Sequence, residues 1–467
     1  RLELSVNNQI TGIYTNLPFK KLSSNLQIAG RYSYYQLMEG LLKTKSNDKY
    51  FYPKYNFGDY NIKFNTHFNN NDQLQFSLLG SSDSYYESLT KEKDVYFHEV
   101  KISSKQTGGA FRYNRMWKKG GITSFQLSKS SYTPEYTAES HFYTPQGSSS
   151  SDSVNNFINK SALQMTHQFP ASKWLNMLTG LAYIQNDYQL SIKNDSLFVN
   201  QSDNSLERLS SFVKNNFQLG RLTLQPGLKL DVVLRDVQPF LQPRINGKYS
   251  LSEHWNVKFG SGLYRQYISK SLLTDNFGQR SFFWQTSNSV TAPSTNGIHN
   301  ALSLSYGANS IELTVEGFFK TTSNINRYFM NDSVSGLFHS VGESKSYGID
   351  LLLKRKFRTH ELLLAYSLGK VDERFEQNSN QEFTHAPQDQ RHEIKLAFLF
   401  RFSKLKISLN QVYGSGFNNS VEGLYFKGRE PYSRFDLGME YDLLSRKVDM
   451  DLGISVLNLF NVQNVRL

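Results

Sequence analysis

The sequence predicts an all-β fold: a transmembrane antiparallel β-barrel of about 22 strands, with short periplasmic turns and long extracellular loops. Three observations support this prediction. Apolar and polar residues alternate with a period of two along much of the 467-residue chain. Aromatic residues reach 14%, although only 38% of residues are hydrophobic and the mean hydropathy is -0.51. Short polar turns alternate along the chain with long polar connections.

The segment 389–413 shows the alternation most clearly. One face of its first strand is predicted to be apolar and to meet lipid, and the other to be largely charged and to line the lumen. The apolar face carries Ile394, Leu396, Phe398, Phe400 and Phe402, and the other carries Glu393, Lys395, Ala397, Leu399 and Arg401. A two-residue turn at 403–404 then pairs Phe402 with Leu405, so both apolar faces lie on one side of the hairpin.

Ten short connections, each between two alternating segments, can be identified. They lie at 20–21, 69–72, 118–121, 170–173, 219–220, 251–254, 307–310, 358–360, 403–404 and between 441 and 448. Long polar connections separate these hairpins, for example at 85–105, 131–156, 192–207 and 269–298. In a barrel whose two ends both lie in the periplasm, ten inner turns imply about 22 strands.

Residues 1–467 are therefore predicted to form one outer-membrane barrel domain. The strand 448–456 should run outward and be followed by a returning strand, but the chain stops at Leu467. Because an unpaired strand edge leaves backbone groups unsatisfied in lipid, we expect the last strand to be missing. Arg1 already opens a strand-like segment, so we also expect the sequence to begin inside a longer protein.

Several segments, in their order along the chain, resemble the C-terminal barrel of TonB-dependent outer-membrane receptors. They are Gln242-Pro243-Arg244-Ile245, Gly317-Phe318-Phe319-Lys320, Ser346-Tyr347-Gly348-Ile349-Asp350-Leu351, Pro387-Gln388-Asp389-Gln390-Arg391-His392, Val412-Tyr413-Gly414-Ser415-Gly416 and Val456-Leu457-Asn458-Leu459-Phe460-Asn461. The resemblance implies a 22-stranded barrel in the outer membrane of a Gram-negative bacterium. It also implies uptake of a scarce, bulky ligand with energy passed on by TonB. In that family an N-terminal plug fills the lumen, and this sequence contains neither the plug nor the segment that contacts TonB.

Composition and motifs argue against several other activities. The absence of Cys excludes disulfides and thiolate metal sites. The net charge of +12 is spread along the strands, so we expect no nucleic-acid partner. The closest match to a catalytic group, His385 and His392 around Asp389, lies within a segment that the resemblance already explains. We therefore expect no catalytic residue, no metal site and no cofactor.

The candidate ligand or partner contacts are aromatic residues in the outer loops. They are Tyr52, Tyr55, Tyr85, Tyr86, Phe142, Tyr143, Phe283 and Trp284. Such side chains provide large contact areas over a ligand or at a protein interface. The alternative is that they form the outer aromatic girdle of the barrel.

Two hypotheses of different classes explain the chain. In the first, the barrel is a TonB-dependent uptake receptor, with outer-membrane lipid and lipopolysaccharide around it. Its protein partners would then be TonB, if a plug lies upstream, and a surface lipoprotein. In the second, a receptor-like barrel serves as a structural or docking subunit of a larger outer-membrane assembly or secretion complex. A diffusion channel ranks lower, because about 22 strands exceed the roughly 16 to 18 of porins, and a surface hydrolase ranks last.

The predicted facing can be tested with one substitution on each side of the wall. Phe398→Arg would place a charge against lipid, at a cost of about 2 to 4 kcal/mol near the midplane, and should reduce the amount of assembled barrel. Lys395→Glu on the lumenal face should be tolerated. Membrane fractionation and heat-modifiable gel mobility would measure assembly, and equal tolerance at both positions would refute the assigned facing.

Overall fold

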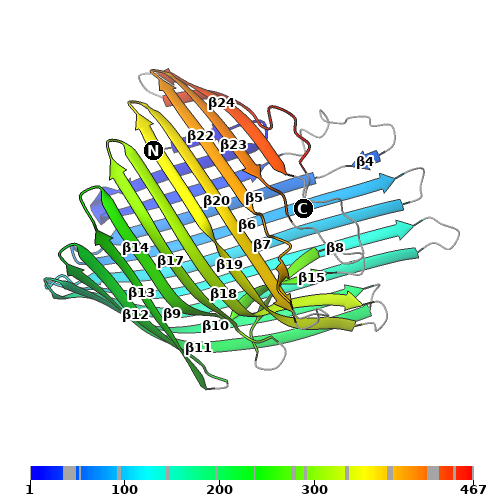
Figure 1. Ribbon diagram of the computed structural model, residues 1–467, viewed down its shortest axis with the longest axis horizontal. Coiled ribbons are helices and arrows are strands. Elements are labelled where there is room, and N and C mark those ends of the chain that lie inside the picture. The colour runs from blue at the N-terminus through cyan, green and yellow to red at the C-terminus, as the bar shows by residue number, and fades with distance from the viewer. Residues whose placement is uncertain are drawn as a thin grey trace.

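The computed structural model describes residues 2–34, 49–51, 54–91, 96–142, 148–194, 197–235, 237–274, 280–288, 292–331, 336–375, 382–417, 431–444 and 449–464. The described residues form one curved sheet of 25 strands, with a single short 3-10 helix, η1 (Lys20–Leu22) (Figure 1). No helix in this part of the chain is long and apolar enough to span a membrane.

Of the 25 strands, β4, β15, β16 and β21 stand outside the main order, and the other 21 pair antiparallel with their neighbours along the chain. This wall consists of β1 (Leu2–Val6), β2 (Ile10–Phe19), β3 (Ser24–Ser33), β5 (Lys54–His67), β6 (Asp72–Lys91), β7 (Tyr96–Met116), β8 (Ile122–Phe142), β9 (Ser148–Ser172), β10 (Leu175–Asn194), β11 (Leu197–Leu219), β12 (Leu222–Val233), β13 (Gln238–Ser250), β14 (Trp255–Gln266), β17 (Thr295–Ala308), β18 (Ile311–Asn331), β19 (Gly336–Phe357), β20 (His360–Phe375), β22 (His392–Phe402), β23 (Leu405–Gly414), β24 (Tyr432–Leu444) and β25 (Asp449–Val456). The antiparallel barrel predicted from the sequence is confirmed.

The short turns are where the sequence predicts them. Nine of the ten predicted turns overlap an observed connection between consecutive wall strands, and the tenth lies at 445–448, outside the described residues, between the paired strands β24 and β25. Phe402 pairs with Leu405 as expected. Between β17 and β18, Asn309 and Ser310 both have positive φ angles, of 48° and 66°, which suits a two-residue hairpin turn whose twist matches that of the strands.

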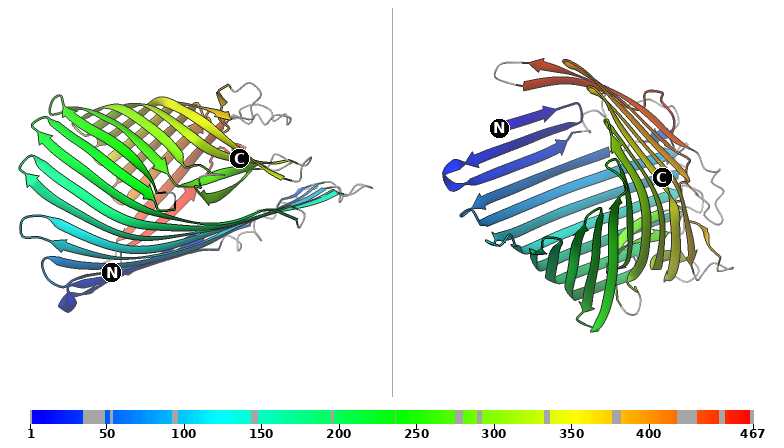
Figure 2. Two further views of the ribbon diagram at one scale, coloured as in Figure 1. Left: turned by 90° about the horizontal axis from the view of Figure 1, so that it is seen from below. Right: turned by 60° about the vertical axis from the view of Figure 1, so that its left-hand side comes forward.

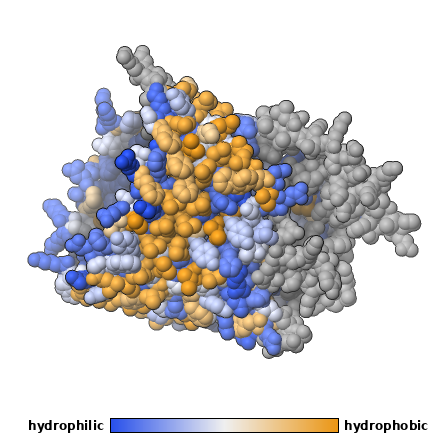
Figure 3. Space-filling view, turned by 45° about the horizontal axis from the view of Figure 1, so that its top comes forward, coloured by the Kyte–Doolittle hydropathy of each residue, from blue (hydrophilic) through white to orange (hydrophobic). Residues whose placement is uncertain are grey.

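The outer face of the wall is apolar because alternate side chains point away from the lumen. Leu181 is 64% exposed, Leu302 60% and Ile349 50%, which is expected of residues that meet lipid instead of a protein core. Figure 3 shows such side chains gathered in a band across the outer face. The lumenal face of β20 and β22 carries ion pairs instead, with Lys395 2.7 Å from Glu393 and Arg401 2.7 Å from Glu361.

At the loop end the structure differs in detail from the sequence interpretation. Much of what the sequence suggests is loop is regular strand, since β6 to β11 and β18 to β19 are 20 to 25 residues long. A tilted membrane strand needs only about 9 to 11 residues. These strands therefore continue beyond the membrane as paired ribbons. Outside the membrane neither face of a strand meets lipid, so both faces can carry polar residues. β4 (Lys49–Phe51) and β21 (Thr384–His385) add short pairs there.

The segment between β14 and β17, expected to be a loop, contains the hairpin of β15 (Ile268–Thr274) and β16 (Arg280–Thr286). Because β14 pairs directly with β17, this hairpin is left out of the wall, and it packs against strands from two parts of the wall. β15 pairs parallel with β18 on one side, while β16 contacts β9 and β10 on the other. Figure 1 labels β15 among these strands.

A compact apolar cluster holds the hairpin in place. It consists of Val154, Tyr188, Leu190, Ile192, Leu273, Phe283 and Tyr328, and Phe283 and Ile192 are fully buried. The Asn156 side chain, only 2% exposed, makes two hydrogen bonds to the backbone of Trp284. Its amide nitrogen donates to the Trp284 carbonyl at 2.9 Å, and its amide oxygen accepts from the Trp284 N–H at 2.7 Å. On the other side, the Tyr328 hydroxyl donates to Gln285 at 2.8 Å. Tyr328 lies 17 residues beyond the turn that begins β18, outside the membrane, and burial raises its pKa to about 12, so the hydroxyl stays a donor.

The wall has two edges, at β1 and β25, and no hydrogen bond joins them within the described ranges. Figure 2 shows the strands curving round from one edge to the other. Beyond β25 the chain still follows β24, with the Leu459 N–H bonded to the Phe435 carbonyl at 2.7 Å and the Asn464 side chain bonded to Ser433. The expectation that a further strand completes the wall remains a prediction.

The role of Asn156 can be tested directly. Asn156→Ala removes both hydrogen bonds to Trp284 and leaves buried backbone groups unpaired, at a cost of about 1 to 3 kcal/mol. Faster amide hydrogen exchange is therefore expected in residues 280–286, with the wall strands unchanged. Asn155→Ala, at the exposed neighbouring position, is the matched control. Unchanged exchange in Asn156→Ala would show that the apolar cluster alone holds the hairpin.

Candidate ligand site in the lumen

Four adjacent wall strands, β11 to β14, place a dense group of polar side chains on the lumenal face near the hairpin. Leu209, Leu228 and Leu241 on these strands are exposed on the outer face, at 48%, 40% and 51%. On β11, β12 and β13 the period of two then turns their neighbours into the lumen. On β14 the Tyr264 ring meets Arg244, while Arg265 and Tyr267, at the end of β14 and just beyond it, contact Phe240 and Arg208. The residues of this lumenal cluster are Arg208, Ser210, Lys229, Asp231, Phe240, Gln242, Arg244, Tyr264, Arg265 and Tyr267.

Asp231 lies at the centre of the lumenal cluster and is fully buried. Its carboxylate accepts hydrogen bonds from the Ser210 hydroxyl at 2.5 Å, the Lys229 ammonium at 2.8 Å and the Gln242 amide at 2.6 Å. Arg208 Nε lies 3.9 Å from the same carboxylate. Paired and bonded in this way, Asp231 meets the conditions under which a carboxylate can be buried.

Aromatic rings hold the arginines of the cluster in place. The guanidinium carbon of Arg208 lies 4.2 Å from the Tyr267 ring centroid, and that of Arg244 lies 4.3 Å from Tyr264. Arg265 stacks on Phe240 at 4.4 Å. The cluster contains four cations, with Lys229, and one carboxylate, so its formal charge is positive. Stacking lets an arginine keep its N–H groups available for a planar anion.

Three buried donors in this cluster have no hydrogen-bond partner among the described residues. They are the Nε atoms of Arg208 and Arg244 and the hydroxyl of Tyr267, a residue only 4% exposed. An unpaired buried donor costs about 1 to 3 kcal/mol, more when it is charged. A cationic cluster with unused donors is therefore suited to accept an anionic group.

The hairpin and the segment after it border this cluster. The Ser287 N–H donates to the Tyr267 carbonyl at 2.8 Å, and Asn204 donates to the Thr286 hydroxyl at 3.1 Å. The Arg265 guanidinium donates to the Ser294 hydroxyl at 2.5 Å. Hairpin and lumenal cluster are thus parts of one hydrogen-bonded network, so a change in one affects the other.

The structure places the aromatic residues predicted from sequence in two different regions. Tyr55 and Tyr85 pair across β5 and β6 above the membrane, and the Tyr86 hydroxyl donates to Glu99 at 3.2 Å. Phe283 is fully buried in the hairpin cluster, and Trp284 is half-buried beside it. Phe142 ends β8, with its side chain not described, and Tyr52 and Tyr143 lie outside the described residues.

Phe283 therefore supports the hairpin, and nothing tests the contact role predicted for it or for the other aromatics. Sequence reasoning missed Arg208, Arg244, Tyr264 and Tyr267. The period of two could place Arg208, Arg244 and Tyr264 on the lumenal face of their strands. It could not show the register that brings them together, or that Tyr267, just beyond the end of β14, joins them.

Two other polar groups have structural explanations. Glu440, Asp442 and Asp451 form the one carboxylate group among the described residues whose oxygens are close enough to hold a cation, and the Lys406 ammonium lies 2.7 Å from Glu440 and 2.9 Å from Asp442. Asp389 is fully buried and accepts the Val371 N–H at 2.8 Å, which fixes the segment before β22.

Comparisons with solved structures show a shared fold at low sequence identity. A variant of the ferric enterobactin receptor of Pseudomonas aeruginosa matches with a TM-score of 0.66 and 13% identity, over 97% of this chain and 72% of the receptor. The ferripyoverdine receptor of the same organism, bound to ferripyoverdine, gives 0.71 and 9%, over 99% and 67%. The siderophore receptor PirA from Acinetobacter baumannii gives 0.62 and 10%, over 98% and 75%.

A search of curated proteins finds no match to this chain. The family comparison is decisive, because the model of the β-barrel of TonB dependent receptor-like proteins matches residues 7–465, almost the whole sequence. The wall of consecutive antiparallel strands and the short turns agree with that match. The chain belongs to the TonB-dependent receptor β-barrel family.

Proposed function

We propose that this chain is the barrel of an outer-membrane receptor of a Gram-negative bacterium. It takes up a scarce, bulky, anionic ligand, of the kind represented by ferric siderophores, using energy passed on by TonB. Family membership supports the receptor role. The solved siderophore receptors with the same fold suggest the ligand class.

The observation that carries the proposal is a set of buried donors in the lumenal cluster that make no hydrogen bond among the described residues. They are the Nε atoms of Arg208 and Arg244 and the hydroxyl of Tyr267. An anionic ligand group would supply the acceptors that these donors lack. Because these donors are buried, where the local dielectric is lower than in water, a charge-assisted hydrogen bond contributes more than a neutral one. The aromatic rings beside the arginines would contact the apolar parts of such a ligand.

The mechanism follows from the position of the cluster. A ligand that enters from the loop end passes the β15–β16 hairpin before it reaches β11 to β14. Since Ser287, directly after the hairpin, is bonded to Tyr267 of the cluster, and Thr286 of the hairpin is bonded to Asn204 on β11, ligand binding at the arginines would alter the contacts that hold the hairpin. We infer that the cluster is a recognition site on the wall. The TonB-coupled step would require the plug domain that the family resemblance implies.

The test uses the full-length gene in its native host under iron limitation. We expect a deletion strain to lose uptake of at least one radiolabelled ferric siderophore from a chemically varied panel, and expect that uptake to require TonB. Normal uptake of the whole panel and normal growth in the deletion strain would contradict the proposal.

Site variants test the lumenal cluster. Arg244→Gln removes one charged donor, and hydrogen bonds to charged groups contribute about 1.5 to 3 kcal/mol, so ligand affinity should fall about tenfold or more. Lys248→Gln, at an exposed position of the same lumenal face of β13 nearer the turns, should bind normally. Binding is measured by titration of the purified full-length receptor. Equal affinities in both variants would exclude Arg244 as a ligand contact.

A further inference from the structure

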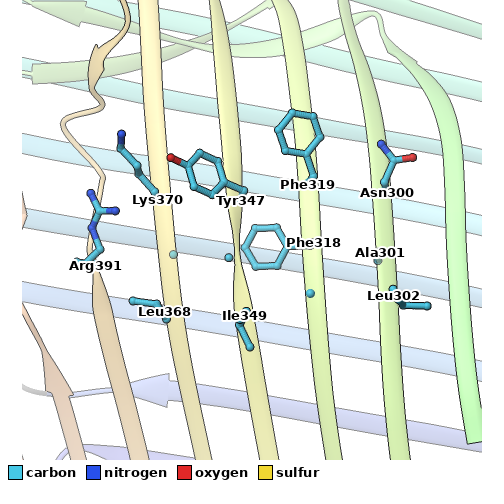
Figure 4. Close-up of a pocket in the computed structure, with 13 residues that line it drawn as sticks. Asn300, Ala301, Leu302, Phe318, Phe319, Tyr347, Ile349, Leu368, Lys370 and Arg391 are labelled. Carbon is cyan, nitrogen blue, oxygen red and sulfur yellow. The ribbon is translucent and has the colours of Figure 1, made fainter.

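The outer face of the wall has a groove of about 690 Å³ across β17, β18, β19, β20 and the start of β22 (Figure 4). Its apolar sides are Leu302, Phe319, Ile349 and Leu368. Leu302 and Ile349 are 60% and 50% exposed, which places this groove on the lipid side of the wall. It is therefore distinct from the lumenal cluster.

A glycine creates the groove. Gly317 pairs with Leu302 and Ile349, so its missing side chain would point outward between them. A Cβ atom built at Gly317 would meet no atom within 4 Å. Glycine weakens a strand interior, and there it often marks a place where a ligand approaches the backbone closely. Here the omitted side chain leaves an apolar trough in the lipid-facing surface.

One end of the groove is polar and basic. Tyr347, Lys370 and Arg391 line this rim, and Figure 4 shows the Tyr347 hydroxyl directed toward Lys370. The Lys370 ammonium lies 2.8 Å from Asp372, and Arg391 lies 3.2 Å from Asp389. Lysine has three N–H donors and arginine five, so each cation retains donors after its carboxylate contact.

More cations continue above the rim on the same wall. Lys345, two residues from Tyr347 on β19, lies 4.1 Å from the Phe383 ring centroid. Arg374 on β20 lies 4.9 Å from the same ring and 2.8 Å from Glu343. Four cations and three carboxylates thus border the loop-side end of an apolar groove, and the cations are in excess. That combination complements a lipid with an acyl chain and a phosphate group.

The depth of the rim identifies the membrane leaflet. Tyr347 is ten residues before the turn that ends β19, and Lys370 is ten residues after the start of β20. With a rise of about 3.4 Å per residue and a tilt of about 45°, both lie about 24 Å from the turns. The apolar band of such barrels is about 25 Å tall. The rim therefore lies at the outer interface, and the groove descends into the outer leaflet.

We propose that this groove binds lipopolysaccharide: an acyl chain lies along Gly317, Ile349 and Leu368, and a lipid A phosphate contacts Lys370 and Arg391. Lipopolysaccharide is the phosphorylated lipid of the outer leaflet, where the rim lies. The proposal needs only that the barrel resides in the outer membrane, and it holds whatever ligand enters the lumen.

The test measures lipid retained by the full-length protein purified from native membranes in mild detergent, by native mass spectrometry. Wild-type protein should retain lipopolysaccharide, and Gly317→Leu, which fills the groove, should retain several-fold less. Gly307→Leu is the matched control, because Gly307 also has no atom within 4 Å of a built Cβ and lies outside the groove. Heat-modifiable mobility confirms that each variant is folded. Equal retention by folded wild type and Gly317→Leu would overturn the proposal.

Readdition of defined lipids to delipidated protein tests the phosphate contact. Binding of lipid A should fall several-fold when its phosphates are removed, and also in Lys370→Gln. Lys354→Gln, which changes an exposed lysine near the turn end of β19, should leave binding unchanged. Equal binding of phosphorylated and dephosphorylated lipid A would overturn the phosphate contact, and equal binding of phosphatidylglycerol and lipid A would overturn the assignment to lipopolysaccharide.

Discussion

Every backbone N–H and C=O group that crosses the hydrocarbon core must be hydrogen-bonded within the protein, because lipid offers no partner. Most features of this chain follow from that constraint. Consecutive strands pair antiparallel from β1 to β25 across 21 wall strands, joined at one end by turns so short that each strand must return beside its predecessor. Within this backbone pattern, the sequence of each strand decides which side chains point to lipid and which point to the lumen.

The two faces of the wall carry different kinds of side chain. On the lipid side, apolar residues such as Leu302 and Ile349 remain exposed, and a single glycine at 317 is enough to open a groove between them. On the lumenal side, charges can be placed close together because water and partner groups are available. There, Asp231 anchors a set of cations that it does not fully satisfy. Selective binding sites can therefore arise on both faces of one sheet without changing its hydrogen bonds.

The β15–β16 hairpin is the main departure from a simple barrel. It is held by buried apolar residues and by Asn156. The Asn156 side-chain amide bonds the carbonyl and the N–H of Trp284, which face away from β15 and would otherwise lack partners at the edge of the hairpin. Its contacts with both β9–β10 and β18 link two parts of the wall above the membrane.

The sequence alone determined the wall. A period of two identifies the strands and assigns their faces, and turn residues locate the hairpins, because both signals are local. The turn at Ser403 and the pairing of Phe402 with Leu405 are examples. The same signals could not show that the polar segments near 85–105 and 131–156 continue as strands, since no lipid-facing alternation marks them.

Tertiary structure decided everything that depends on distance across strands. Phe283 looked like a loop aromatic but is buried, because the hairpin packs against β9, β10 and β18. Arg208 and Arg244 lie on the strands before and after β12, and only the strand register brings them near Asp231. The groove at Gly317 likewise depends on its neighbours in β17 and β19. Strand identity is encoded locally, whereas sites form from side chains that only the pairing of neighbouring strands brings together.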